Sequence, residues 1–184
     1  MLDNILANHC APALAGIKPS NIVSCFKSEN SNIVEDVEEL NQKLNCKDIY
    51  IDILCECSKR FLLIVYIKKK LKEHLSNKDI KSFLKSYGYD ENYSLQDYIK
   101  KLSKRIKCNE DFPHEIGAFL GYPLEDVKCF IEDKGKDCLY IGEWKVYTDV
   151  ENAKKTFCRY KTCKKALSQR VEQGQRLEQI FHAA

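Results

Sequence analysis

The sequence predicts an α+β fold, in which a small, mostly antiparallel sheet is covered by helices. Apolar residues alternate with polar ones over 49–57, as in a strand, and recur every three or four residues over 33–45, as in a helix. A third observation is the stretch 112–147, where two short helical segments precede a predicted β-hairpin. We describe these last segments as a helix-turn-helix plus β-hairpin unit.

The composition is that of an ordinary globular protein, with 44% hydrophobic and 31% charged residues in a chain of 184. A domain of this length can bury roughly 70% of its unfolded surface, so it needs no disulfide or metal to fold. We expect one domain over residues 1–173 and a C-terminal tail over 174–184. The net charge of +3 is too small to indicate a polyanionic partner by itself.

Ten cysteines are many for this length. The start, MLDNILANHCAPALAG, lacks the charged and then apolar pattern of a secretory leader. No stretch approaches the roughly 18 apolar residues that a membrane helix needs. We therefore expect a cytoplasmic protein with no membrane partner and with reduced thiols, most of them buried.

The N-terminal quarter contains four predicted elements. One or two helical turns over 2–8 lead into HCAPALAGIKP, a loop over 9–19 whose path its prolines fix. A short strand follows at 22–27. The helix over 33–45 then begins at Asn32, whose side chain we expect to cap it.

Two strands, 49–57 and 61–67, are predicted to form an antiparallel hairpin. In the first, period-two spacing places Cys55 and Cys57 on the core side. The second is apolar on both faces and is predicted to be central. Three helices follow, at 68–75, at 78–87 with Asn77 as its cap, and at 95–106 after Ser94.

The stretch from residue 112 holds most of the turn-forming residues. Pro113 begins a predicted helix that ends near residue 120, and Pro123 begins another that ends before Gly135. Strands around Gly142 and Glu143 are predicted to form a hairpin with a type II′ turn and to join the main sheet. A long helix covers 150–171, and the tail beyond it is predicted to continue as helix or to fray.

Three motifs carry a family resemblance: HCAPALAGIKPSN near the start, PHEIGAFLGYPLEDV in the middle, and GEWKVY followed by Phe157, Tyr160 and Cys163. In this order they resemble the Firmicutes family catalogued as domain of unknown function 3793, over about residues 5–165. The resemblance implies a single cytoplasmic bacterial domain. It implies no activity.

Four residues are candidates for chemistry. His9, Cys10, His114 and Glu115 could bind a transition metal if the fold brings the two pairs together. Alternatively, Cys10 could be a nucleophilic or redox thiol, with His114 and Glu115 as acid or base groups. The structural alternative is a capping glutamate, a hydrogen-bonded histidine and a buried thiol.

Three further residues are candidate ligand contacts. Lys18 lies among small residues, where an anionic ligand could approach it, although a surface lysine is the alternative. Trp144 and Tyr147, with Phe157 and Tyr160, could form the wall of an aromatic pocket near His114, or they could be core.

The function that we expect is binding of a small ligand or metal at this Cys/His/Glu site, with redox chemistry as one option. The alternative is a non-catalytic regulator or adaptor that binds protein or nucleic acid through residues 113–148 or the basic C-terminal helix. The acidic residues of the helix after Pro123 disfavour nucleic acid. No phosphate-binding glycine motif and no pair of C-x-x-C motifs occurs.

Overall fold

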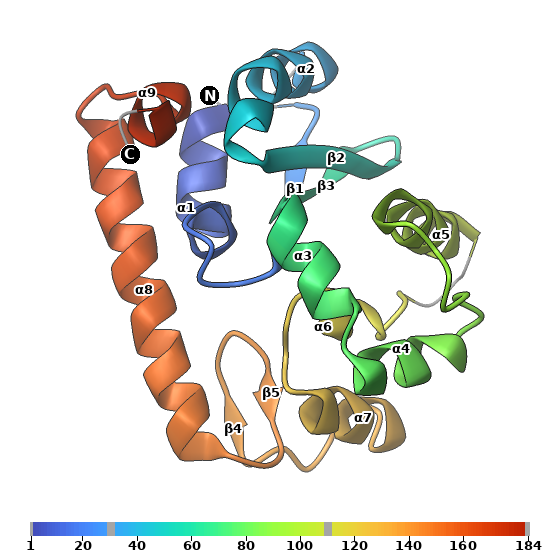
Figure 1. Cartoon of the computed structure of the whole chain (residues 1–184). Helices are drawn as coiled ribbons and strands as arrows, with labels where there is room; N and C mark the ends of the chain where they lie inside the picture. Colours follow the sequence, from blue (N-terminus) through green and yellow to red (C-terminus); the bar gives the residue numbers. More distant parts are fainter. Residues whose placement is uncertain (1, 29–31, 109–111, 183–184) are drawn as a thin grey trace.

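A three-stranded antiparallel sheet lies at the centre of the fold (Figure 1). The structure is a computed structural model and describes residues 2–28, 32–108 and 112–182. The strands β1 (Ser20–Phe26), β2 (Ile49–Glu56) and β3 (Arg60–Ile67) are ordered β1-β3-β2. The most apolar strand, β3, is central, and the predicted hairpin of β2 and β3 is confirmed.

Helices cover both faces of this sheet, so the predicted α+β class is confirmed (Figure 1). One face is covered by α1 (Leu2–Leu14), α2 (Ile33–Leu44), α8 (Val150–Glu172) and α9 (Leu177–His182). The other is covered by α3 (Lys68–Leu75), α4 (Lys78–Lys85), α5 (Leu95–Cys108) and α6 (Ile116–Phe119). Side chains of β3 alternate between the two cores, with Leu63 and Val65 in the first and Ile64 and Tyr66 in the second.

Two of the three predicted helix caps are confirmed. The Asn77 side chain accepts hydrogen bonds from two backbone N–H groups of α4, at 2.8 and 3.4 Å. Ser94 and Asp97 form a reciprocal capping box at the start of α5. The cap predicted at Asn32 is wrong, because its backbone is not extended (φ −117°, ψ 35°) and its side chain makes no cap hydrogen bond.

The expectation that most thiols are buried is wrong. Of the nine cysteines whose side chains the structure describes, only Cys10 and Cys25 are fully buried. In β2 the pairing register shifts between Ile53 and Cys55, which ends the simple alternation. Cys55 consequently packs against the second core, and Cys57 is exposed beyond the end of the strand.

The proline-fixed loop predicted at 9–19 is also wrong over its first half. The first helix, α1, continues through Pro12 to Leu14, and the chain turns at Gly16, whose φ is +66°. The carbonyl of Pro12 accepts the backbone N–H groups of Ile17 and Lys18 and so closes that turn. Burial of the helix against α8 outweighs the hydrogen bond that Pro12 cannot donate.

The predicted β-hairpin exists but does not join the main sheet. Strands β4 (Tyr140–Ile141) and β5 (Lys145–Val146) form a separate two-stranded sheet beside α7 (Leu124–Glu132) (Figure 1). Three residues connect them, and Gly142 does not have the positive φ of a type II′ turn, so that turn is wrong. Glycine is required there for space, because a Cβ would lie 2.2 Å from the Phe157 ring.

The predicted long helix is confirmed as α8, but the chain beyond it neither continues this helix nor frays. It turns at Gly174, whose φ is +89°, and α9 folds back onto the first core. Leu177 and Ile180 are buried there and belong to the first core. In the described ranges, no helix combines the length and apolar character needed to cross a membrane.

Candidate functional site

The predicted pair His9 and Cys10 lies on α1, not in a loop. Neighbouring residues of a helix point about 100° apart, and here His9 is exposed while Cys10 is completely buried in the first core. Burial raises the pKa of the Cys10 thiol to about 12, and the Lys18 charge opposes this only partly. At neutral pH Cys10 is therefore a protonated, packed thiol.

The second predicted pair is also divided. Pro113 does not begin a full helix: a turn at His114 and Glu115 precedes the short α6. Glu115 is buried, forms an ion pair with Arg105 and accepts a hydrogen bond from the Tyr89 hydroxyl. His114 is exposed and meets the Phe130 ring edge-on, with centroids 5.0 Å apart.

The four predicted metal ligands are not gathered. Across residues 2–28, 32–108 and 112–182, no three His, Cys, Asp or Glu side chains form a group that could hold a metal ion. Cys10 belongs to the core under α1, whereas Glu115 is occupied by Arg105 on the opposite side of the sheet.

What the fold does bring together is a cluster of aromatic side chains around Lys18 and the β4–β5 hairpin. Tyr122 stacks on Trp144 with ring centroids 5.0 Å apart, and Trp144 meets Phe157 edge-on at 4.5 Å. The Lys18 ammonium lies 4.9 Å from the centroid of Tyr122 and 5.7 Å from that of Tyr160. All three stretches that carry the family resemblance therefore meet at this cluster.

One close backbone approach and several side-chain hydrogen bonds hold the cluster together. A Cβ on Gly121 would lie 2.5 Å from the Pro19 ring, so the turn after α6 sits directly on the turn after α1. The Tyr122 hydroxyl donates to the backbone carbonyl of Glu143 at 3.2 Å, and both carboxylate oxygens of Glu143 accept from Lys164. These contacts fix the hairpin between α7 and α8.

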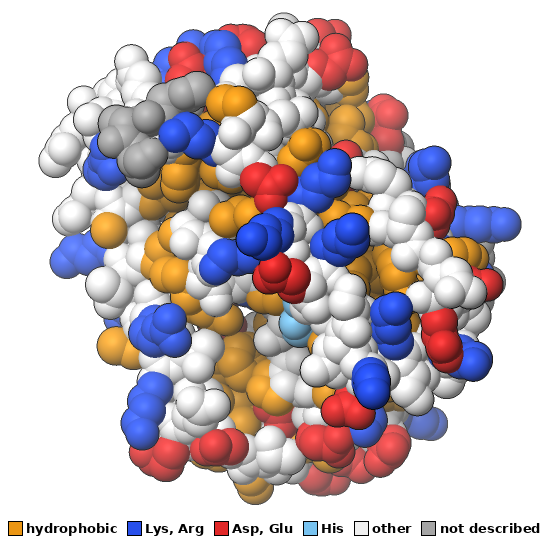
Figure 2. All heavy atoms as spheres, in the orientation of Figure 1, with side chains coloured by type: hydrophobic (Ala, Val, Ile, Leu, Met, Phe, Trp, Pro, Cys, Tyr) orange, Lys and Arg blue, Asp and Glu red, His pale blue; other side chains and the backbone are white. Residues whose placement is uncertain are grey.

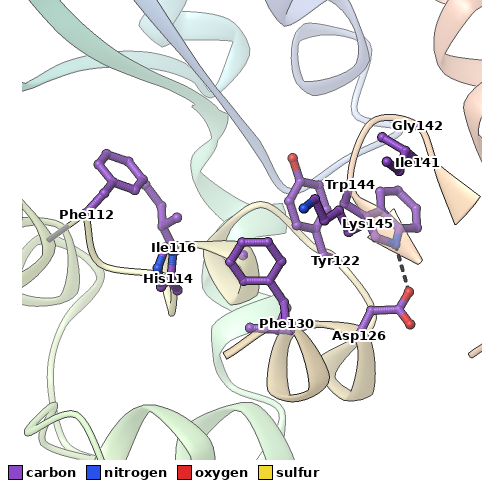
Figure 3. A pocket seen from close by; sticks show the side chains of 12 residues that line it. Phe112, His114, Ile116, Tyr122, Asp126, Phe130, Ile141, Gly142, Trp144 and Lys145 are labelled. Atoms are coloured by element: carbon purple, nitrogen blue, oxygen red, sulfur yellow. Dashed lines mark hydrogen bonds between the residues drawn. The ribbon is translucent and has the colours of Figure 1, made fainter. Parts of the chain in front are cut away.

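Asp126 anchors the same hairpin and is a residue that the sequence analysis missed. It is buried and accepts four hydrogen bonds: from Trp144 Nε1 (Figure 3), from the backbone N–H groups of Tyr147 and Thr148, and from the Thr148 hydroxyl. In the sequence it looks like one of the acidic residues that favour a helix N-terminus. Only the fold shows which donors it accepts from.

A cavity of about 300 Å³ lies between this hairpin and the α6–α7 segment (Figure 3). Its walls are mostly apolar, and its polar side chains are those of His114, Tyr122, Asp126, Trp144 and Lys145. Aromatic rings predominate in the lining: Phe112, Tyr122, Phe130 and Trp144. Of the predicted ligand contacts Trp144 is in the wall, whereas Lys18 and Tyr147 are not among the lining residues.

The polar side chains that line the cavity differ in how many hydrogen bonds they already form within the protein. Asp126 already accepts four hydrogen bonds, three of them at Oδ1, and the Lys145 ammonium donates to the backbone carbonyl of Gly135 at 2.6 Å. In the described part of the chain, the His114 imidazole has no hydrogen-bond partner. The cavity therefore offers stacking surface and one imidazole that is available to a ligand.

The chain was compared with known families, curated proteins and solved structures. A family model described as a protein of unknown function (DUF3793) matches residues 6–181. The chain belongs to this family. The match extends past the predicted end near residue 165 and includes most of α9. Neither the curated proteins nor the solved structures gave a match.

Proposed function

We propose that this DUF3793 chain binds a small, planar, largely apolar ligand in the cavity between α7 and the β4–β5 hairpin. The observation that carries the proposal is the cavity itself, with aromatic walls around one unengaged imidazole. Pockets for small molecules have this pattern, in which apolar and aromatic walls surround a few polar groups that fix orientation.

The walls and the size suggest the class of ligand. A volume of about 300 Å³ is at the lower end of the range for ligand sites, so one or two fused rings fit better than a nucleotide. Phe112 and Phe130 offer ring faces and edges for stacking. A hydroxyl or ring nitrogen on the ligand would then pair with His114.

Binding is better supported than catalysis by the chemistry of the lining. No described lining residue is a thiol, and His114 has no hydrogen-bonded carboxylate or hydroxyl beside it to make an acid–base pair. Nine free thiols in the described part also suit a reducing, cytoplasmic location, which we include in the proposal.

The test is calorimetric titration of the protein with 2-naphthol and with naphthalene, and Trp144, the only tryptophan, provides a second signal. We expect 2-naphthol to bind about fivefold more tightly than naphthalene, since one hydrogen bond contributes about 1 kcal/mol. This advantage should disappear in His114→Ala. In Phe112→Ala both compounds should bind more weakly.

Leu139→Ala is the matched control, because Leu139 is as apolar and exposed as Phe112 and lies outside the lining. It should bind both compounds like the wild type. Binding that is unchanged in Phe112→Ala and His114→Ala would reject the cavity as the binding site.

A second candidate is an adaptor that contacts protein through the same hairpin. The observation in its favour is the run Leu139, Tyr140 and Ile141, all of which are exposed. Of this run, Ile141 also lines the cavity, so this one residue can equally belong to the mouth of the pocket. The adaptor function would be favoured if Leu139→Ala abolished capture of a partner protein and 2-naphthol did not bind.

A further inference from the structure

Lys18 is among the most deeply buried charged side chains in the described part of the molecule, with 3% of its surface exposed. Its position is fixed by the turn after α1 and by Pro19, which packs on Gly121. Within the residues described, its ammonium has no hydrogen-bond or ion-pair partner and lies over the rings of Tyr122 and Tyr160. Such an environment is costly for a charge, because ring quadrupoles replace only part of its hydration.

The charged groups near Lys18 do not neutralise the positive charge of its ammonium. Glu143, on the hairpin loop, attracts the ammonium, but both of its carboxylate oxygens are already bonded by Lys164 at 2.8 and 3.0 Å. Cys10, on α1, lies near and is protonated. Two ammonium groups therefore share one carboxylate, and the cluster carries one uncompensated positive charge.

The titration of Lys18 agrees with this imbalance. Burial is the main cause that lowers the pKa of its ammonium from the ordinary 10.5 to about 8; Glu143 opposes this shift, and Lys164 contributes to it. A bound anion would supply the missing charge and raise the pKa again.

We propose that Lys18 anchors a second binding site, for a small carboxylate. One negative charge balances the Lys18, Lys164 and Glu143 cluster, and a carboxylate supplies this charge. The rings of Tyr122 and Tyr160 are suitable neighbours for the short apolar remainder of such a ligand. Figure 2 shows that the surface is hollowed beside α8 above the β4–β5 hairpin, and hydrophobic side chains line the hollow.

This site does not depend on the function proposed above. Lys18 is not among the lining residues of the 300 Å³ cavity, and acetate, the simplest probe, has no ring to stack in that cavity. Phe112→Ala should therefore leave acetate binding unchanged, which separates the two proposals.

The test is thermal unfolding at pH 7 in acetate, propionate, phosphate and chloride at equal ionic strength. We expect acetate and propionate to raise Tm in the wild type by several degrees more than chloride does, whereas phosphate, which is partly a monoanion at this pH, serves only to compare another oxyanion. In Lys18→Met the carboxylates should lose this advantage. The Lys18→Met protein without ligand should melt at a higher temperature than the wild type, because a buried, uncompensated charge has been removed.

Lys70→Met is the matched control. Lys70 belongs to the same region, but its ammonium donates to the backbone carbonyl of Gly16. It should keep the response to acetate. The proposal would be overturned if chloride raised the Tm of the wild type as much as acetate does, or if acetate still raised the Tm of Lys18→Met. It would also be overturned if Lys18→Met melted at a lower temperature than the wild type and acetate left the Tm of the wild type unchanged.

A second measurement keeps the proposal testable if Lys18→Met does not fold. In wild-type protein labelled with ¹³C at lysine Cε, the Lys18 signal should titrate near pH 8 in chloride and at a clearly higher pH in acetate. A midpoint that acetate does not move would reject the site.

Discussion

At the scale of single residues, Asp126 shows how one buried carboxylate can hold a segment that has few other contacts. It accepts four hydrogen bonds from three residues of the hairpin segment. In Asp126→Asn an amide donor would face other donors, so we expect the free energy of unfolding to fall by about 3 kcal/mol. Urea denaturation followed by Trp144 fluorescence measures this loss. Asp133→Asn, an exposed change at the end of the same helix, should cost little, and equal losses in both variants would contradict the assigned role.

The thiols make a second prediction at this scale. Cys57 is exposed, and hydrogen bonds from the backbone N–H groups of Lys59 and Arg60 lower its pKa. With iodoacetamide at pH 7 we expect Cys57 to react fastest and the buried Cys10 only after unfolding. Peptide mapping by mass spectrometry gives the order. Labelling of Cys57 no faster than that of the exposed Cys158 would show that these hydrogen bonds do not stabilise the thiolate.

At the scale of elements, α9 is the part whose role is easiest to test. Leu177 is completely buried, and a Leu-to-Ala change at such a position costs about 3 kcal/mol. We expect Leu177→Ala to lose this much stability and a chain ending at residue 173 to lose more. Thermal and urea unfolding measure both. Gln173→Ala, at an exposed position, is the control, and a truncated chain as stable as the full one would show that α9 is dispensable.

The elements also show what could be predicted from the sequence and what could not. The strands β2 and β3, the α4 cap and the α5 capping box follow from local patterns, since spacing and side-chain chemistry decide them. The path of α1 through Pro12 and the separation of β4–β5 from the main sheet do not. In both cases tertiary contacts with α8 outweigh local preferences. The bulge in β2 is likewise decided by the second core, where Leu54 is fully buried.

At the scale of the whole molecule, stability should depend on pH in a way that identifies Lys18. Between pH 8 and 10.5 the unfolded chain binds a proton at this amine that the folded chain does not, so the free energy of unfolding rises with pH. The gain is about 3 kcal/mol across this window. Above pH 9 the raised pKa of Cys10 acts in the opposite direction, since the unfolded thiol ionises first.

The comparison that isolates Lys18 is therefore wild type against Lys18→Met. We expect the variant to be more stable at pH 7 and the difference to shrink towards pH 10. Urea titrations at half-unit intervals measure it. A difference that is constant with pH would show that Lys18 has an ordinary pKa in the folded protein.

The candidate site could be predicted only in part, and the reason also lies at this scale. The three motif segments lie together, and Lys18 and Trp144 both lie against the Tyr122 ring. The pairs His9–Cys10 and His114–Glu115 are divided, because adjacent residues on a helix or turn point in different directions. Tyr122, Asp126 and Phe130 were not predicted, since nothing in their local sequence distinguishes them from helix caps and core.

The packing of α1 beside α8 has a consequence for the protein as the ribosome makes it (Figure 1). The first helix leaves the ribosome early, but its neighbour α8 begins only at Val150. At about 5–20 residues per second, translation leaves α1 without α8 for on the order of ten seconds. Until α8 has been synthesised, Lys18 also lacks Tyr160. The packing of the first helix and the Lys18 site can therefore be completed only after the last long segment of the nascent chain has been made.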